Sequence, residues 1–223
     1  MDGNRRYAEE QGVEVNEGHA QGKKKLEEVM DWCMDIGVEI LTVFAFSAEN
    51  FSRPEEEVDY IMGMLESTFF SFAEDSRIHE NEVALRVIGD RSLIPENLLH
   101  AVEHAEKRTE KYSKFHMNVA IAYGGRQEII SAVKKIAEEV QGGELKIEDI
   151  NERSVSDHMY TYDLPDPDLI LRTSGEIRVS NFLLWQLAYS EFYFSDVYWP
   201  GFRYIDFLRA IRAYQQRTRR FGQ

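Results

Sequence analysis

The chain has 223 residues, of which 43% are hydrophobic, so it has enough apolar material for a folded core and is not a disordered protein. Its formal net charge of −14, from 26 basic and 40 acidic residues, makes a nucleic acid an unfavourable partner. Its only cysteine, Cys33, excludes an intrachain disulfide, and the sequence contains no signal peptide or apolar run long enough to span a bilayer, so we expect a cytoplasmic protein.

The apolar pattern alternates between helical and strand periodicity along the chain. A helical repeat from Leu26 ends at Gly37, a plausible stop signal. The further predicted helices and strands, in chain order, are the strand Glu39–Phe46, a helix from Pro54 to about His79, the strand Val83–Ile88, the helix Pro95–Lys114, the strand Met117–Tyr123, the helix Gln127–Val140, the strands Asp168–Arg172 and Phe192–Phe194, and the helix Tyr204–Arg219. This alternation predicts an α/β fold: a single domain over residues 1–223 with a mostly parallel central sheet flanked by helices.

Arginine and glycine follow the predicted strands. Segments 47–54, 89–91, 124–126 and 172–182 all contain arginine, and three of the four contain glycine. Ligands of open parallel sheets bind beyond the carboxyl ends of the strands. Arginine pairs with phosphate oxygens, and glycine lets backbone N–H groups approach them. Any one segment can be a turn with a solvated arginine, but together the four predict a ligand that carries phosphate.

The N-terminal segment 2–7 reads Asp-Gly-Asn-Arg-Arg-Tyr. By itself it fits a frayed basic terminus. It also fits a phosphate loop in which Gly3 opens the backbone, Arg5 and Arg6 supply positive charge, and a helix follows. Asp2 would then be a ligand of Mg²⁺, which prefers one or two carboxylates together with substrate phosphates.

Six stretches, in order from residue 2 to residue 222, resemble the successive motifs of the cis-prenyltransferases, the undecaprenyl and polyprenyl diphosphate synthases. They are residues 2–8, Gly18-His19, residues 45–54, Tyr123-Gly-Gly-Arg126, residues 172–186 and Arg219-Arg-Phe-Gly222. The amino-acid sequences of the first and fifth stretches look closer to those of archaeal and eukaryotic members than to the commonest bacterial form.

The resemblance implies an enzyme that condenses isopentenyl diphosphate sequentially onto farnesyl or geranylgeranyl diphosphate. The product would be a long polyprenyl diphosphate of undecaprenyl or dolichyl type, the precursor of a glycosyl carrier lipid. Mg²⁺ is the implied cofactor, and Mg²⁺ with arginine would stabilise the departing diphosphate. The alternative is a non-catalytic subunit of a heteromeric cis-prenyltransferase. Such subunits tend to lose the Asp-Gly-Asn and Arg-x-Ser loops, both of which this chain keeps.

The resemblance also assigns site residues. It implies Asp2 and Asn50 as catalytic residues, and Asp2 with Glu191 as metal ligands. The implied substrate-binding residues are Gly3, Asn4, Arg5, Arg6, Tyr7 and His19 for the allylic diphosphate, Ser47, Ala48, Glu49, Phe51 and Arg53 for substrate orientation, Arg172, Arg178, Val179 and Ser180 for isopentenyl diphosphate, and Arg220 and Gly222, which reach that site across a dimer interface.

Further expectations follow from the resemblance. The protein would be a homodimer, and its product would extend into a hydrophobic tunnel partly lined by the helix after Pro54. The protein would contact the inner face of a membrane peripherally for product release. Family members carry a strand just before the Asp-Gly-Asn loop. The resemblance therefore implies that the first strand of the sheet lies upstream of Met1.

Overall fold

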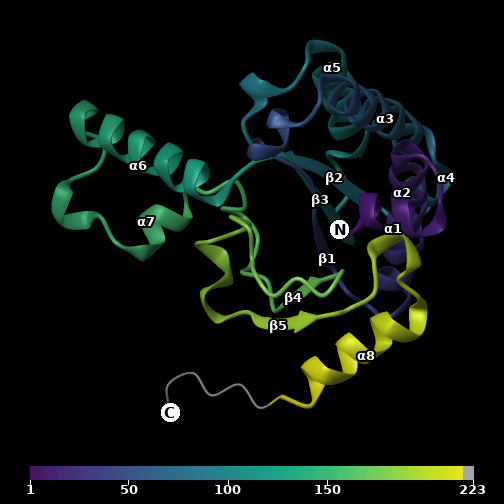
Figure 1. Ribbon diagram of the computed structural model, residues 1–223. Helices are drawn as coiled ribbons and strands as arrows, with labels where there is room; N and C mark the ends of the chain where they lie inside the picture. Colours follow the sequence, from purple (N-terminus) through teal and green to yellow (C-terminus); the bar gives the residue numbers. More distant parts are fainter. Residues whose placement is uncertain (218–223) are drawn as a thin grey trace. The chain divides into compact units, whose positions relative to one another are not determined.

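The computed structural model describes residues 1–217, and these residues form two compact units (Figure 1). One unit, called the terminal unit here, contains residues 1–41, 168–178 and those from Ser190 on. The other, called the central unit, contains residues 42–167 and 179–189. Arg220 and Gly222 lie outside the described residues.

A parallel sheet forms the core of the central unit. Its three strands are β1 (Ile40–Ser47), β2 (Val83–Ile88) and β3 (Phe115–Tyr123), in the order β1-β3-β2. β2 and β3 run parallel, with Val83 opposite Phe115 and Ile88 opposite Ala120. β3 is the middle strand and its residues are buried almost throughout, as expected for a strand covered on both faces.

Helices α3 (Glu55–Glu74) and α5 (Glu96–Thr109) pack against each other in this unit, and α5 packs on β2. The predicted helix from Pro54 to about His79 is in fact two helices, because the backbone is extended at Asp75. The Asp75 carboxylate accepts the backbone N–H of Arg77 and caps the short helix α4 (Ser76–Glu80). The sequence offered no glycine or proline to mark this break.

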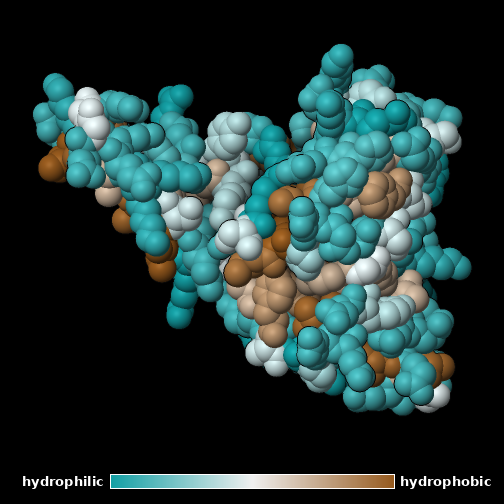
Figure 2. Space-filling view, turned by 90° about the horizontal axis from the view of Figure 1, so that it is seen from above, coloured by the Kyte–Doolittle hydropathy of each residue, from teal (hydrophilic) through white to brown (hydrophobic). Residues whose placement is uncertain are grey.

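Helix α6 (Gly125–Gly142) follows β3 and has the short helix α7 (Glu152–Ser156) beside it. Ile130 and Val133 lie three positions apart on α6, and each is 55% exposed. Figure 2 shows brown, hydrophobic side chains along the part of the surface that α6 and α7 form. This arm therefore carries apolar area that the central unit itself leaves uncovered.

The terminal unit combines helices with a second parallel pair of strands. Its elements are α1 (Asn4–Gln11), α2 (Val15–Asp35), β4 (Leu169–Arg172), β5 (Glu191–Phe194) and α8 (Tyr204–Gln215). The indole of Trp32 on α2 packs against Phe202 and Phe207 and so joins α2 to the segment that enters α8. The indole N–H of Trp199 donates to the carbonyl of Gly22 at 2.8 Å. These contacts hold α2 over the chain that follows β5.

The predicted α/β fold with parallel strands flanked by helices is confirmed, and all five predicted strands are present within one or two residues of their expected ends. The single-domain organisation over residues 1–223 stays a prediction. None of the helices within residues 1–217 has both the length and the apolar character that a bilayer-crossing segment requires.

Candidate functional site

The backbone of Asp2 is fixed at the end of β4. Its N–H donates to the Thr173 hydroxyl at 3.0 Å, and the same hydroxyl donates to the Asp2 carbonyl at 2.9 Å. The N–H of Trp199 donates to that carbonyl as well, at 3.0 Å. Gly3 follows with φ of 101°, a left-handed conformation that favours glycine, and α1 begins at the next residue. The predicted phosphate loop is therefore an ordered turn at the carboxyl end of a strand.

Two arginines hold the Asp2 carboxylate. Arg172 Nη2 lies 2.8 Å from Asp2 Oδ2, and Arg6 Nη2 lies 3.6 Å from Asp2 Oδ1. Burial disfavours the charged carboxylate, but the hydrogen bond and positive charge of Arg172, with Arg6 further away, keep the pKa of Asp2 below its usual value. Asp2 is thus an anion at neutral pH with its oxygens aimed at two guanidinium groups.

Glu176 joins Arg6 to Arg178. Its Oε1 lies 2.7 Å from Arg6 Nη1, and its Oε2 accepts a hydrogen bond from Arg178 Nη1. Arg6 also donates to the Ser174 hydroxyl at 2.7 Å, and Arg172 donates to the backbone carbonyl of Arg178. Three arginines and two carboxylates therefore share one hydrogen-bonded cluster, here called the arginine cluster: Asp2, Arg6, Arg172, Glu176 and Arg178.

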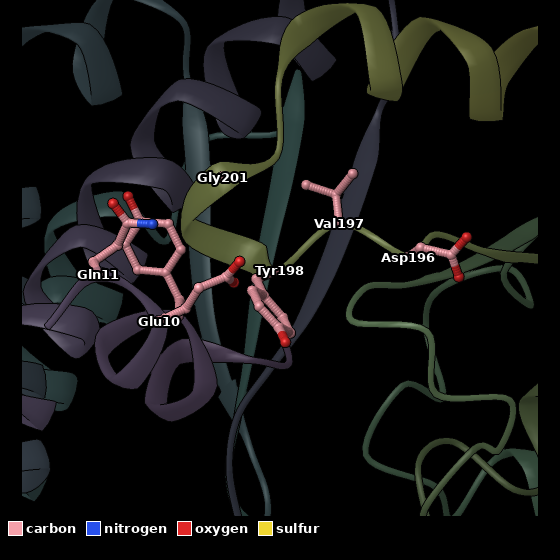
Figure 3. A pocket seen from close by; sticks show the side chains of 7 residues that line it. Glu10, Gln11, Asp196, Val197, Tyr198 and Gly201 are labelled. Atoms are coloured by element: carbon pink, nitrogen blue, oxygen red, sulfur yellow. The ribbon is translucent and has the colours of Figure 1, made fainter.

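The other predicted residues of α1 and α2 have different surroundings. Asn4 packs on α2, and its Oδ1 is buried with no hydrogen-bond partner among the described residues. His19 is buried on α2, and Arg5 lies on α1. Tyr7 lines a hollow of about 420 Å³ together with Glu10, Gln11, Asp196, Val197, Tyr198 and Gly201 (Figure 3). Two carboxylates line this hollow, so it is unsuited to a diphosphate.

The predicted orienting residues lie in the central unit. Ser47 ends β1, and Ala48, Glu49, Asn50 and Phe51 form a 3-10 turn after it. Asn50 Oδ1 accepts the backbone N–H of Ser47 at 3.1 Å, so the Asn50 carboxamide caps its own turn.

Two flanking side chains stabilise this turn. Arg53 Nη1 lies 3.1 Å from Glu57 Oε1 on α3, and the Phe51 ring meets the edge of Phe46. Burial opposes ionisation of Glu49, but hydrogen bonds from its own backbone, Asn181 and Ser47 lower the pKa of its carboxyl.

Val179 and Ser180 also belong to the central unit and come directly before Asn181. Ser180 has φ of 48° and Asn181 has φ of 62°. Asn181 forms hydrogen bonds with residues that follow two different strands, although no role was predicted for it. Glu176 was likewise unassigned, and its position between two arginines in sequence was the only signal that pointed to it.

The two predicted metal ligands are not neighbours. Asp2 is bonded at the end of β4, whereas Glu191 is the first residue of β5 and pairs with Arg217. Glu191 pairs with Leu169, four residues before Thr173, so a rise of about 13 Å separates the backbone levels of the two residues. Within residues 1–217, no three or more His, Cys, Asp and Glu side chains are grouped to hold a metal ion.

Comparison with known proteins gives consistent matches along the whole chain. Residues 1–222 match the family model described as putative undecaprenyl diphosphate synthase. The chain is 52% identical over 222 residues to the tritrans,polycis-undecaprenyl-diphosphate synthase (geranylgeranyl-diphosphate specific) of Thermoplasma volcanium, covering 100% of this chain and 86% of that protein. It is 55% identical over 225 residues to the protein of the same name from Methanocaldococcus jannaschii, covering 100% and 80%.

Solved structures agree with these matches. The crystal structure of lavandulyl diphosphate synthase from Lavandula x intermedia in complex with dimethylallyl diphosphate is 37% identical, with a TM-score of 0.96 over 100% of this chain and 95% of that one. A probable undecaprenyl diphosphate synthase from Campylobacter jejuni is 34% identical, with a TM-score of 0.80 over 92% and 93% of the two chains.

Proposed function

Because the chain belongs to the undecaprenyl diphosphate synthase family, we propose that it extends an allylic prenyl diphosphate with isopentenyl diphosphate units to a long polyprenyl diphosphate. Prenyl transfer is the chemistry of this family. Geranylgeranyl diphosphate as the primer and an undecaprenyl-type product, the precursor of a glycosyl carrier lipid, are the finer parts of the proposal. The names of the archaeal relatives support the primer and the undecaprenyl product.

The observation that carries the proposal is the arginine cluster. Its three guanidinium groups pair with the carboxylates of Asp2 and Glu176. An incoming diphosphate can replace these carboxylates as the partner of the arginines and gain bidentate, charge-assisted hydrogen bonds. The site would thus attract an anion locally, although the whole chain carries a net charge of −14.

Mg²⁺ fits this cluster only in part. The cluster offers the ionised carboxylate of Asp2, and the substrate phosphates would have to supply the further oxygens that Mg²⁺ requires. Bound there by Asp2, Mg²⁺ would act as a Lewis acid on the departing diphosphate. Glu191 fits this role less well, because β5 places it at the opposite end of the strand pair.

The residues of the chain have separable tasks in the transfer. Arg5 and Arg6 would orient the allylic diphosphate and stabilise the negative charge that develops as the carbon–oxygen bond breaks. Arg172, Arg178 and Ser180 would bind the diphosphate of isopentenyl diphosphate, whose double bond forms the new carbon–carbon bond before a proton is lost. Asn50 is a weak base, and its Oδ1 already accepts a hydrogen bond, so orientation of substrate suits it better than proton removal.

The product would need an apolar channel. The buried residues on α3 are Ile61, Met62, Leu65, Phe69 and Phe72, together with Thr68 and Ala73, and α3 packs against α5. Phe70, by contrast, is 38% exposed. This largely apolar face supports a tunnel wall, in which methionine would adapt to a growing chain. A long apolar product also supports a cytoplasmic enzyme that contacts a membrane surface peripherally.

We also propose that the protein is a homodimer. The exposed side chains of Ile130 and Val133 on α6 provide an apolar surface that a second copy would cover. Ile130→Glu should shift the protein to monomer in analytical ultracentrifugation. Leu93→Glu, at an exposed leucine away from α6, is the control and should leave the dimer intact. A monomeric wild type, or an Ile130→Glu dimer, would contradict the proposal.

The primary test is incorporation of labelled isopentenyl diphosphate in the presence of Mg²⁺, with farnesyl or geranylgeranyl diphosphate as primer. We expect wild-type protein to elongate geranylgeranyl diphosphate and Asp2→Ala to lose turnover while keeping its circular dichroism spectrum. Retained turnover in Asp2→Ala would remove Asp2 from the mechanism. Wild-type protein that works only when a second, different subunit is added would support the non-catalytic alternative.

A second measurement tests the assignment of Arg178. Arg178→Ala should raise the apparent KM for isopentenyl diphosphate far more than the KM for the allylic primer. Arg153, 89% exposed on α7, is the control for the loss of an arginine, and Arg153→Ala should change neither value. Equal increases in both KM values would contradict the assigned pocket.

A further inference from the structure

Asn181 is a junction in the central unit. Its Nδ2 donates to Glu49 Oε1 at 2.9 Å and to Gln127 Oε1 at 3.1 Å, and its Oδ1 accepts the backbone N–H of Arg126 at 2.8 Å. Its backbone carbonyl accepts the N–H of Gly125 at 2.7 Å. The carboxamide thus uses both amide hydrogens and its oxygen, and this network fixes its orientation.

Asn181 also completes the start of α6. The first N–H groups of a helix need acceptors from outside the helix, and the residue before α6, Gly124, has no side chain to provide one. Asn181 supplies two acceptors, its carbonyl to Gly125 and its Oδ1 to Arg126. A Cβ on Gly124 would lie 2.7 Å from Asn181 Nδ2, so glycine is needed for this close approach.

The backbone around Asn181 is held in an uncommon conformation. Ser180, Asn181 and Leu183 have φ of 48°, 62° and 44°, in the left-handed region that asparagine tolerates better than serine or leucine. The Phe182 ring stacks on Phe44 of β1. Such conformations persist only where the surrounding contacts enforce them, and they concentrate at functional sites.

From these contacts we propose that Asn181 is a positioning residue that ties the turn carrying Glu49 and Asn50 to the turn carrying Val179 and Ser180. The proposal rests on the proposed function, in which those two turns orient the substrates and bind isopentenyl diphosphate. Asn181 itself touches no substrate. It holds the two turns in one register, so that isopentenyl diphosphate bound at Ser180 meets the orienting turn at a fixed distance.

Asn181→Asp is the informative variant. It keeps the size of the side chain and the oxygen that caps α6, but it replaces the two donated hydrogen bonds with a carboxylate that faces Glu49 and Gln127 Oε1. We expect the KM for isopentenyl diphosphate to rise about tenfold while the KM for the allylic primer stays within about twofold, since only the link between the two turns is lost. Glu49→Gln in the same chain supplies an amide that can donate to the new carboxylate. The double variant should therefore restore the hydrogen bond between the two turns.

Asn97→Asp is the matched control. Asn97 Nδ2 donates to Glu66 Oε2 at 2.5 Å, so it repeats the asparagine–glutamate contact in the same unit, away from the two turns. This variant should keep both KM values of the wild type. An equal rise of both KM values in Asn181→Asp would overturn the proposal.

Amide hydrogen exchange tests the link without requiring activity. The amides of residues 48–53 should exchange faster in Asn181→Asp than in wild type, and more slowly again in the double variant. Unchanged exchange in Asn181→Asp would refute the link. If wild-type protein showed no prenyl transfer while the exchange pattern appeared as expected, the proposed function would fail and the positioning contact would stand.

Discussion

Gly18→Ala tests whether the packing of α1 on α2 positions the arginine cluster. A Cβ built on Gly18 lies 2.4 Å from the backbone carbonyl oxygen of Asn4 and 2.9 Å from the Cβ of Ala8. An ordinary close C···O contact is about 3.3 Å, so the methyl group would push the two helices apart by about 0.9 Å. The carbonyl belongs to the backbone and cannot rotate away as a flexible side chain could.

The expected effects on stability and activity follow from that shift. Overpacking of this kind lowers the free energy of unfolding by about 1–3 kcal/mol. Alanine in place of an unhindered helical glycine raises it by up to about 1 kcal/mol. α1 begins two residues after Asp2 and carries Arg6, so its displacement should move both charges relative to Arg172. Misplacement by about 1 Å can cost roughly a hundredfold in rate, and we expect kcat/KM to fall between tenfold and a hundredfold.

Gly63→Ala is the matched control. Gly63 lies within α3, and a Cβ there would meet nothing within 4 Å. Thermal unfolding should separate the two variants by about 2–16 °C, because about 1–4 kcal/mol divides them in a chain of this length. Gly18→Ala with the melting temperature and kcat/KM of Gly63→Ala would refute the reasoning.

Two further predictions concern buried polar contacts. Glu128 is buried, and its carboxylate accepts a hydrogen bond from the Tyr123 hydroxyl at 2.5 Å. In Glu128→Gln an amide replaces this carboxylate acceptor, so the free energy of unfolding measured in urea should fall by about 2–4 kcal/mol. A change under about 0.5 kcal/mol would contradict this prediction. Hydrogen bonds to the Ser154 carbonyl and the Glu139 carboxylate raise the pKa of His158. Protonated His158 therefore stabilises the fold fully below the pKa of an unfolded histidine, and this stabilisation is lost as pH rises through the pKa of His158 in the folded protein. The melting temperature of His158→Gln should therefore lie further below wild type at pH 6 than at pH 8.5, and an equal difference at both pH values would disprove the assignment.

The secondary structure was largely predictable, because apolar periodicity is a local property of the chain. Strand β2 was predicted to the residue, and β3 began only two residues earlier than expected. The break at Asp75 was missed, since an aspartate inside a helical pattern becomes a cap only when the chain turns there. Helix α1 was foreseen only as a helix that follows the phosphate loop.

The residue types of the candidate site were predictable from the sequence, but the hydrogen-bond partners of those residues were less so. Asp2, Arg6, Arg172 and Arg178 come together in the terminal unit as the phosphate chemistry of their segments suggested. Asn181 had no distinguishing feature in sequence, and only its hydrogen bonds identify it.

The segment Gly124-Gly125-Arg126 shows where sequence reasoning was incomplete. Its glycines suggested a phosphate loop, but in the structure they permit close packing. A Cβ on Gly125 would lie 2.8 Å from Leu184 Cγ, and a Cβ on Gly124 would lie 2.2 Å from Gln127 Oε1. A glycine in the sequence indicates that a side chain is disfavoured at that position. Only the structure shows which atoms occupy the space that a Cβ would need.

The amino-acid sequence alone predicted the alternation of helices and strands, a phosphate-binding role for the loops and the family that the chain resembles. These properties depend on neighbours within one turn of a helix or a few positions of a strand. The tertiary structure decided which guanidinium faces which carboxylate, as with Arg172 and Asp2, which are 170 positions apart. A hydrogen bond requires two atoms within about 3 Å, and only the packing of buried faces brings such distant segments that close.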